Sequence, residues 1–204
     1  MAQRAISVSD LLSKKYKLFP FDGDWYAAFE NPERYGCWFI WGHSGNGKTT
    51  FILKLCKELS KYDRILYNSL EEGAAHTMQK AFLNAGLASV KRRLILVSES
   101  IKDLCERLDK DKSPNIIVID SFQYTNLTFE KYLALKNRYP KKLFIINSQA
   151  EGKKPDGKPA VRTSYDASLK IWVEGYRAFS KGRYIGPIGY YTIWDKGAKD
   201  YHGN

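Results

Sequence analysis

The chain has 204 residues, of which 44% are hydrophobic and 27% charged, and 33 lysines and arginines against 22 aspartates and glutamates give a formal net charge of +11. This composition is that of a globular chain with a buried core, and it excludes a disordered or fibrous protein. No apolar run is long enough to span a bilayer and no apolar segment opens the chain, so we expect a cytoplasmic protein with no membrane contact.

The three cysteines predict neither a disulfide framework nor a zinc site. Cys37, Cys56 and Cys105 are odd in number, far apart in the sequence and each within an apolar stretch, as expected of reduced core thiols. The three histidines are scattered, without a cysteine or histidine at ligand spacing.

The positive charge favours polyanionic partners such as nucleic acid or nucleotides. A basic surface that only keeps the chain soluble is the alternative. The densest basic cluster is formed by Lys131, Lys136, Arg138, Lys141 and Lys142.

Apolar runs alternate with amphipathic stretches along the chain. The runs predict strands at Cys37–Trp41, Ile65–Leu70, Leu94–Val97, Ile116–Asp120, Leu143–Asn147, Leu169–Val173 and Tyr190–Trp194. Helical spacing predicts helices over Thr49–Lys61, over Ile101–Leu108 behind a capping Ser100, and near Phe129–Arg138, before Pro140.

Strand–helix alternation of this kind indicates an α/β fold with a mostly parallel twisted sheet and helices on both faces. A short Gly/Pro segment without a helix joins the last two predicted strands, so we expect them to pair antiparallel. We expect one domain over residues 1–204. Its aromatic-rich extension, residues 1–36, would pack on the sheet or on a neighbouring subunit, and residues 151–165 would form a mobile basic loop.

A phosphate-binding loop follows the first predicted strand. The residues Gly42, His43, Ser44, Gly45, Asn46, Gly47, Lys48 and Thr49 match G-x-x-x-x-G-K-[ST], and a helix follows directly. Backbone amides of such a loop surround phosphate oxygens, while the helix N-terminus adds partial positive charge. We expect these residues and Thr50 to bind a nucleotide, with Lys48 on the β- and γ-phosphates and Thr49 on Mg²⁺.

Three further positions follow predicted parallel strands and belong at the same sheet edge. Asp120 ends the Ile116–Asp120 run and is the expected partner of Mg²⁺, with capping of the next turn as the alternative. Glu71 is the expected carboxylate that polarises the attacking water, although Glu72 could be the base or both could cap a helix. Gln149 would sense the γ-phosphate, unless local contacts satisfy its amide.

Together these motifs resemble the RecA-like ATPases, and among them the DnaB-type helicase core and its RadA/KaiC-like relatives. The resemblance covers roughly residues 37–194. It rests on the P-loop, on Ser69-Leu70-Glu71, on the strand ending at Asp120 and on Ser148-Gln149. It implies a three-layer RecA-like P-loop NTPase fold that binds ATP and Mg²⁺.

The most specific match comes late in the chain. Helicases of this type carry Lys-x-Arg and then Gly-Pro-x-Gly, matched here by Lys181, Arg183 and Gly186–Gly189 with one additional residue between Arg and Gly. The resemblance implies that Lys181 and Arg183 act in a neighbouring subunit's nucleotide site as piston lysine and arginine finger. A basic turn with solvated side chains is the alternative.

The resemblance also implies DNA contacts through the segments that follow the metal-site and sensor strands. The second offers Lys153, Lys154, Lys158 and Arg162, and the first offers Phe122 and Tyr124 as stacking groups. A flexible basic loop that is merely solvated is the alternative. With only about 36 residues before the P-loop strand and no linker helix among them, we do not expect a complete helicase motor.

We therefore expect an Mg²⁺-dependent ATPase that forms a ring or filament and acts on DNA, most directly single-stranded DNA, in replication or recombination. The alternative is an ATP-dependent oligomeric switch or assembly factor that recruits a protein partner without translocating DNA. A small-molecule kinase shares the P-loop, but the Lys-x-Arg element and the lack of an Arg-rich lid argue against it.

Overall fold

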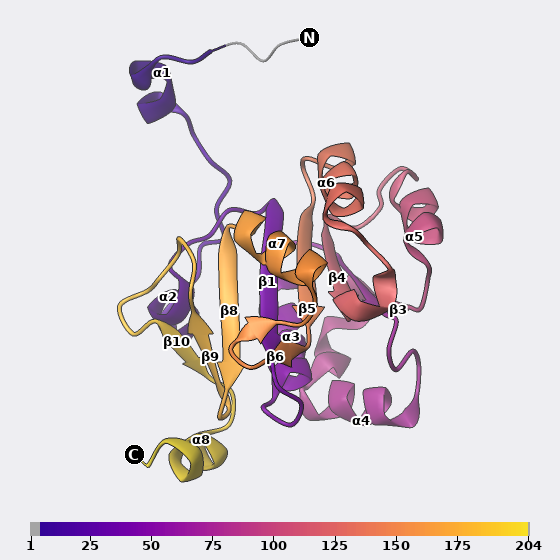
Figure 1. The fold of residues 1–204 in the computed structure, drawn as a ribbon, viewed down its shortest axis with the longest axis vertical. Helices are drawn as coiled ribbons and strands as arrows, with labels where there is room; N and C mark the ends of the chain where they lie inside the picture. Colours follow the sequence, from indigo (N-terminus) through magenta and orange to yellow (C-terminus); the bar gives the residue numbers. More distant parts are fainter. Residues whose placement is uncertain (1–4, 204) are drawn as a thin grey trace.

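Parallel strands form the centre of one eight-stranded sheet in the order β10-β9-β8-β1-β5-β4-β2-β3 (Figure 1). The structure is a computed structural model that describes residues 5–203, so residues 1–4 and 204 of the expected 1–204 domain lie outside it. The sheet strands are β1 Gly36–Gly42, β2 Ile65–Ser69, β3 Leu94–Val97, β4 Ile116–Asp120, β5 Leu143–Ser148, β8 Leu169–Glu174, β9 Arg177–Ser180 and β10 Tyr190–Thr192.

Helices cover both faces of this sheet. They are α1 Val8–Ser13, α2 Gly23–Phe29, α3 Lys48–Leu59, α4 His76–Asn84, α5 Ile101–Leu108, α6 Phe129–Arg138, α7 Lys158–Asp166 and α8 Asp195–His202, with 3-10 helices η1 Leu87–Arg93 and η2 Phe122–Thr125. The three helices that the sequence predicts are present as α3, α5 and α6, and Ser100 caps α5 as expected. No helix within residues 5–203 is long and apolar enough to cross a membrane.

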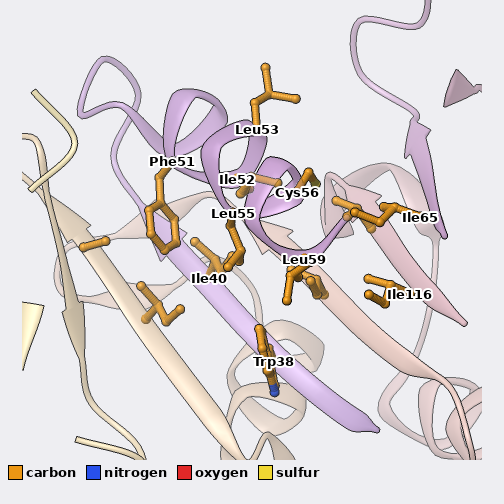
Figure 2. Packing of buried hydrophobic residues seen from close by; sticks show 14 of the residues in the cluster. Trp38, Ile40, Phe51, Ile52, Leu53, Leu55, Cys56, Leu59, Ile65 and Ile116 are labelled. Carbon is orange, nitrogen blue, oxygen red and sulfur yellow. The ribbon is translucent and has the colours of Figure 1, made fainter. Parts of the chain in front are cut away.

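The alternation of side chains along β1 produces two separate cores. Trp38 and Ile40 point to the face covered by α3, where they pack with residues such as Leu55 and Leu59 (Figure 2). Cys37 and Phe39 point to the opposite face, into the cluster beneath α5, α6 and α7. The result is the expected three-layer arrangement, in which each fully buried side chain contributes about 1.5–3 kcal/mol.

The aromatic N-terminal segment packs on this protein's own sheet, the first of the two arrangements considered. Phe19 is fully buried and meets the Trp38 ring edge-on, with 5.4 Å between ring centroids. Trp25 in α2 stacks on Tyr191 in β10 at 4.2 Å. The preceding helix α1 has no buried residue and lies beyond the upper edge of the sheet in Figure 1.

The expectation that the last two predicted strands pair with each other is wrong. An additional strand, β9, lies between them and is antiparallel to both β8 and β10. Sequence reasoning missed β9 because it has only four residues and begins with Arg177. The following loop is held close to α2, where the Gly186 amide donates to the Ala28 carbonyl at 3.2 Å. A Cβ on Gly186 would come within 2.3 Å of the Tyr26 carbonyl oxygen, so a side chain has no room there.

The expectation of a mobile loop over residues 151–165 is also wrong. This segment forms a small hairpin, β6 Ala150–Glu151 with β7 Lys154–Pro155, followed by α7. The Trp41 indole N–H holds the hairpin by donating to the Lys153 carbonyl at 3.1 Å. The buried face of α7 consists of Ala160, Thr163 and Ser164. Because these residues are small and mostly polar, a search for apolar periodicity does not detect the helix.

Truncation of Phe19 tests whether the N-terminal segment belongs to the core. We expect Phe19→Ala to lower the free energy of unfolding by about 3–5 kcal/mol, because it leaves a cavity against Trp38. The matched control is Leu12→Ala, since Leu12 is 81% exposed and its loss should leave stability unchanged. Urea denaturation measures both. Equal stability of the two variants would contradict the packing described here.

Candidate active site

A cleft of about 630 Å³ opens where the parallel strands end. Because β1, β2, β4 and β5 run parallel, the residues that follow them meet at this edge. The cleft is lined by Ser44, Gly45, Gly47, Lys48, Thr49, Thr50, Glu71, Glu72, Asp120, Ser121, Asn147, Gln149, Ala150 and Tyr176. Its volume is in the range of cavities that bind small-molecule ligands.

The P-loop connects β1 to α3 at the floor of this cleft. Gly47 caps α3 with a φ of 92°, a left-handed conformation that a residue with a Cβ rarely adopts. The Lys48 ammonium donates to the His43 carbonyl at 2.9 Å, so the loop closes around its own lysine. Burial lowers the pKa of Lys48, while the negative charges of Asp120 and Glu71 act in the opposite direction.

Two of the predicted nucleotide-binding residues lie beside the cleft instead of lining it. The Asn46 side-chain oxygen accepts the Gly175 amide at 2.7 Å and so ties the loop to the turn between β8 and β9. The His43 ring lies against Trp172 at 5.8 Å. These contacts support the shape of the loop from outside.

Asp120 ends β4 as a buried carboxylate between two neighbouring strands. It accepts hydrogen bonds from the Tyr67 hydroxyl of β2 and from the Asn147 amide of β5, the latter at 2.5 Å. Burial raises the pKa of Asp120, and these two hydrogen bonds oppose that shift. Sequence reasoning missed Tyr67 and Asn147. A buried asparagine at the end of an apolar strand is a signal that could have identified the second.

The two glutamates after β2 take different directions. The Glu71 carboxylate accepts the Ser121 hydroxyl at 3.2 Å and so lies beside the end of β4. Glu72 accepts the Thr77 hydroxyl at 2.8 Å, within the first turn of α4. Both line the cleft, but the contact to Thr77 matches the helix-capping alternative for Glu72, and Glu71 remains the predicted base.

Gln149 enters the cleft directly after β5, as its place in the sequence predicts. Its backbone N–H donates to the Gln123 side-chain oxygen at 3.2 Å, while the Gln123 amide donates to Ser148 at 2.9 Å. Gln123 therefore positions the segment that carries Gln149, a contact that no sequence motif indicated. Tyr176, also not predicted, reaches the cleft from the turn between β8 and β9.

Lys181 and Arg183 lie at the far end of β8 from the cleft. Val173, near the end of β8, pairs with Gly42, whereas the Arg183 amide donates to the Ser168 carbonyl, before β8 begins. A strand of six residues spans about 20 Å. Both side chains are exposed, and neither reaches the nucleotide cleft of its own chain.

The four predicted DNA-binding residues divide between two elements. Lys153 and Lys154 are exposed on the β6–β7 hairpin, and Lys158 is exposed at the start of α7. Arg162 is engaged by its own chain, because it pairs with Glu130 at 3.0 Å and lies over the Phe129 ring at 4.4 Å.

The two predicted stacking groups also differ. Phe122 is 5% exposed and packs against Phe39, so the expectation that it offers a free stacking face is wrong. Tyr124 is exposed.

The oxygen groups in the cleft fit Mg²⁺. The Thr49 hydroxyl and the Asp120 carboxylate are hard oxygen ligands of the kind this ion prefers, together with phosphate and water. Within residues 5–203 no lysine or arginine forms an ion pair with Asp120. The buried Asn147 side-chain oxygen beside it also lacks a hydrogen-bond partner in that range.

Comparison with known proteins supports the same fold. No family model matches the chain. The DNA repair protein RadA of Haemophilus influenzae is 35% identical over 88 residues, which are 43% of this chain and 19% of RadA. The chain thus spans about a fifth of the length of this curated relative.

Three solved structures resemble most of the chain. The flagellar accessory protein FlaH from Methanocaldococcus jannaschii has a TM-score of 0.60 at 14% identity, over 87% of this chain and 92% of FlaH. The KaiC-like protein PH0186 from Pyrococcus horikoshii OT3 has 0.56 at 17%, over 78% and 89%. The third structure, of an ATPase domain, has 0.54 at 19%, over 77% and 80%. The chain has the RecA-like P-loop ATPase fold that its motifs imply.

The burial of Asp120 predicts a stability that depends on pH. Burial places its folded-state pKa above the unfolded-state value of about 3.9, so the folded chain binds this proton more tightly. The wild-type chain therefore loses stability relative to Asp120→Asn as the pH rises through the folded-state pKa. We expect Asp120→Asn to be about 0.5–2 kcal/mol more stable at neutral pH and to lose this advantage in acid.

Urea denaturation in EDTA at several pH values measures this difference. Asp156→Asn is the control, since Asp156 lies outside the cleft lining and is only half-buried. A variant at position 120 that is less stable than wild type at neutral pH would contradict the buried, uncompensated carboxylate.

Proposed function

We propose that the chain binds ATP with Mg²⁺ in this cleft, hydrolyses it, and acts on DNA in replication or recombination as an assembly whose subunits complete one another's sites. One observation carries the proposal: Lys48, Thr49, Glu71, Asp120 and Gln149, from four different segments, line a single cleft. A fold shared with nucleotide-binding proteins is weaker support, because function depends on the site and not on the fold.

The P-loop would hold the triphosphate. Its backbone amides and the start of α3 offer hydrogen-bond donors and partial positive charge, and Lys48 would contact the β- and γ-phosphates. Thr49 would bind Mg²⁺ directly, and Asp120 would orient its water ligands. When bound, the ion neutralises charge on the phosphate oxygens. It would also offset the unfavourable burial of the Asp120 carboxylate.

Glu71 and Gln149 would act on the γ-phosphate end. Glu71 would orient and polarise the attacking water, with its own position set by the Ser121 hydroxyl. Gln149 would donate its amide to the γ-phosphate and so report its presence to the β6–β7 hairpin, which begins at the next residue. This connection gives the nucleotide state a direct route to the exposed Lys153 and Lys154.

A neighbouring subunit would supply Lys181 and Arg183. Both are exposed and lie about one strand length from their own cleft, which suits side chains offered to another copy. A guanidinium supplied in trans neutralises charge that develops during phosphoryl transfer and makes hydrolysis depend on assembly.

The DNA-related part of the proposal rests on charge and on one relative. The net charge of +11 favours a polyanionic partner, and the hairpin presents Lys153 and Lys154 to solvent. The DNA repair protein RadA is a curated relative with detectable identity. The rival function, an oligomeric switch without DNA translocation, shares the nucleotide site and differs in its response to DNA.

Substitution of Lys48 and Glu71 separates binding from hydrolysis. We expect Lys48→Ala to abolish ATP binding and hydrolysis. Glu71→Gln should retain ATP binding but lower the hydrolysis rate at least hundredfold, because it removes the water-activating carboxylate. Glu72→Gln is the matched control, with a small expected effect. Nucleotide binding by fluorescence and steady-state hydrolysis, with and without single-stranded DNA, provide the measurements.

Stimulation by single-stranded DNA would support the DNA-related function. A hydrolysis rate that is indifferent to DNA would favour the switch, and a Glu71→Gln rate equal to wild type would exclude Glu71 as the base.

Mixing two inactive variants tests completion of the site in trans. We expect Arg183→Ala and Glu71→Gln each to be inactive. Their mixture should regain part of the wild-type rate, since Glu71→Gln subunits supply Arg183 to the intact clefts of Arg183→Ala subunits. Arg177→Ala, a change of the same charge on β9, is the control for Arg183→Ala. Assembly of the mixture without any recovered hydrolysis would contradict the arrangement in trans.

A further inference from the structure

The two ends of the parallel strands carry opposite charge. A basic residue stands within a few positions of the start of each strand: Arg34 before β1, Arg64 before β2, Arg93 before β3, Lys112 before β4 and Lys141 before β5. We call this side of the sheet the amino edge. The opposite edge carries Glu71, Glu72 and Asp120 around the nucleotide cleft.

This separation directs a large polyanion away from the nucleotide cleft. A field from clustered positive charge raises the local concentration of a polyanion and its association rate. The net charge of +11 thus belongs in good part to a surface that the nucleotide site does not use. By contrast, part of the basic cluster around α6 is internally neutralised, since Lys136 pairs with Asp166 at 2.5 Å and Arg138 pairs with Asp109.

A cleft of about 940 Å³ lies in the amino edge. Its walls include Lys14 and Lys17 from the N-terminal segment, Arg34 before β1 and Lys141 before β5. The Arg34 amide donates to the Lys17 carbonyl at 3.0 Å, which fixes the N-terminal segment along the sheet. Lysines distant in sequence therefore face one groove.

Two of these lysines are available to a ligand. The ammonium groups of Lys17 and Lys141 have no hydrogen-bond or ion-pair partner within residues 5–203. The single acidic side chain among the described residues that line the cleft, Asp63, is engaged by Asn115 at 3.0 Å and lies 3.9 Å from Arg34. The cleft therefore presents free positive charge.

An exposed aromatic side chain stands among these charges. Tyr16 lines the cleft and is 40% exposed, and the Lys14 ammonium lies 5.0 Å from its ring centroid. Lysines beside an accessible aromatic face bind a phosphate backbone and an unpaired base together, as in grooves that hold single strands. A duplex keeps its bases stacked and would leave Tyr16 without a partner.

We propose that the amino-edge cleft binds single-stranded nucleic acid, with Lys14, Lys17 and Lys141 on phosphates and Tyr16 stacked on a base. This site is separate from the β6–β7 hairpin, and it does not rest on the proposed ATPase function.

Two triple variants of equal charge test the site in the full chain without ATP. The amino-edge variant is Lys14→Ala, Lys17→Ala, Lys141→Ala. The control is Lys80→Ala, Lys196→Ala, Lys199→Ala, which removes exposed lysines on α4 and α8. Fluorescence anisotropy of a labelled oligothymidylate, titrated with salt, gives the affinity. We expect the amino-edge variant to lose at least tenfold and its salt slope to fall by about 2, at about 0.7 per phosphate contact.

The control should stay within about twofold of wild type. Tyr16→Ala should lose about tenfold in affinity with an unchanged salt slope. Equal losses in the two triple variants would overturn the proposal, because the affinity would then follow net charge alone. Equally tight binding of a duplex, of polyglutamate or of phosphatidylserine vesicles, with the same dependence on these lysines, would overturn the assignment to single strands.

Hydrolysis without nucleic acid distinguishes this site from the proposed ATPase. The amino-edge variant should keep the wild-type basal rate. Lys48→Ala should lose that rate and keep the oligonucleotide affinity. A Lys48→Ala protein that loses the affinity would place the contact in the nucleotide cleft and overturn the amino-edge site.

Discussion

The parallel pairing of β1 with β5 on one side and β8 on the other is the constraint on which the rest of the structure depends. It places β1 at the centre of the sheet, buries Trp38 and Phe39 on opposite faces, and directs the P-loop into the gap beyond the strand ends. The parallel register of β4 with β2 and β5 then sets Asp120 between Tyr67 and Asn147. Misalignment of any one strand would disperse the cleft.

The same alignment separates the two ends of the molecule chemically. The carboxyl ends of the strands carry acidic and amide side chains around Lys48, and burial there disfavours the charged forms of both Lys48 and Asp120. The amino ends carry exposed lysines and arginines with little internal compensation. A phosphate ligand with its divalent cation suits the first environment, and an extended polyanion suits the second.

Local pattern located most elements of the fold and failed where packing replaced pattern. The P-loop, Asp120 and the buried strands follow from residue type and spacing, since apolar runs must be buried and strand ends must be polar. Strand β9 and helix α7 escaped detection because their buried faces are short or built from small polar residues such as Thr163. The residues that support Asp120 and Gln149, namely Tyr67, Asn147 and Gln123, come from separate elements and have no common motif.

The sequence alone determined the RecA-like fold class, the loop built for phosphate, and the order in which the candidate residues follow the strands, because these depend on local composition and periodicity. Tertiary structure decided that Asn46 is tied to the turn after β8, that Arg162 is occupied by Glu130, and that Lys181 and Arg183 face away from their own cleft. It also brought Lys17 and Lys141 to one groove at the amino edge. These outcomes depend on strand order and register between segments far apart in the chain, which local pattern does not encode.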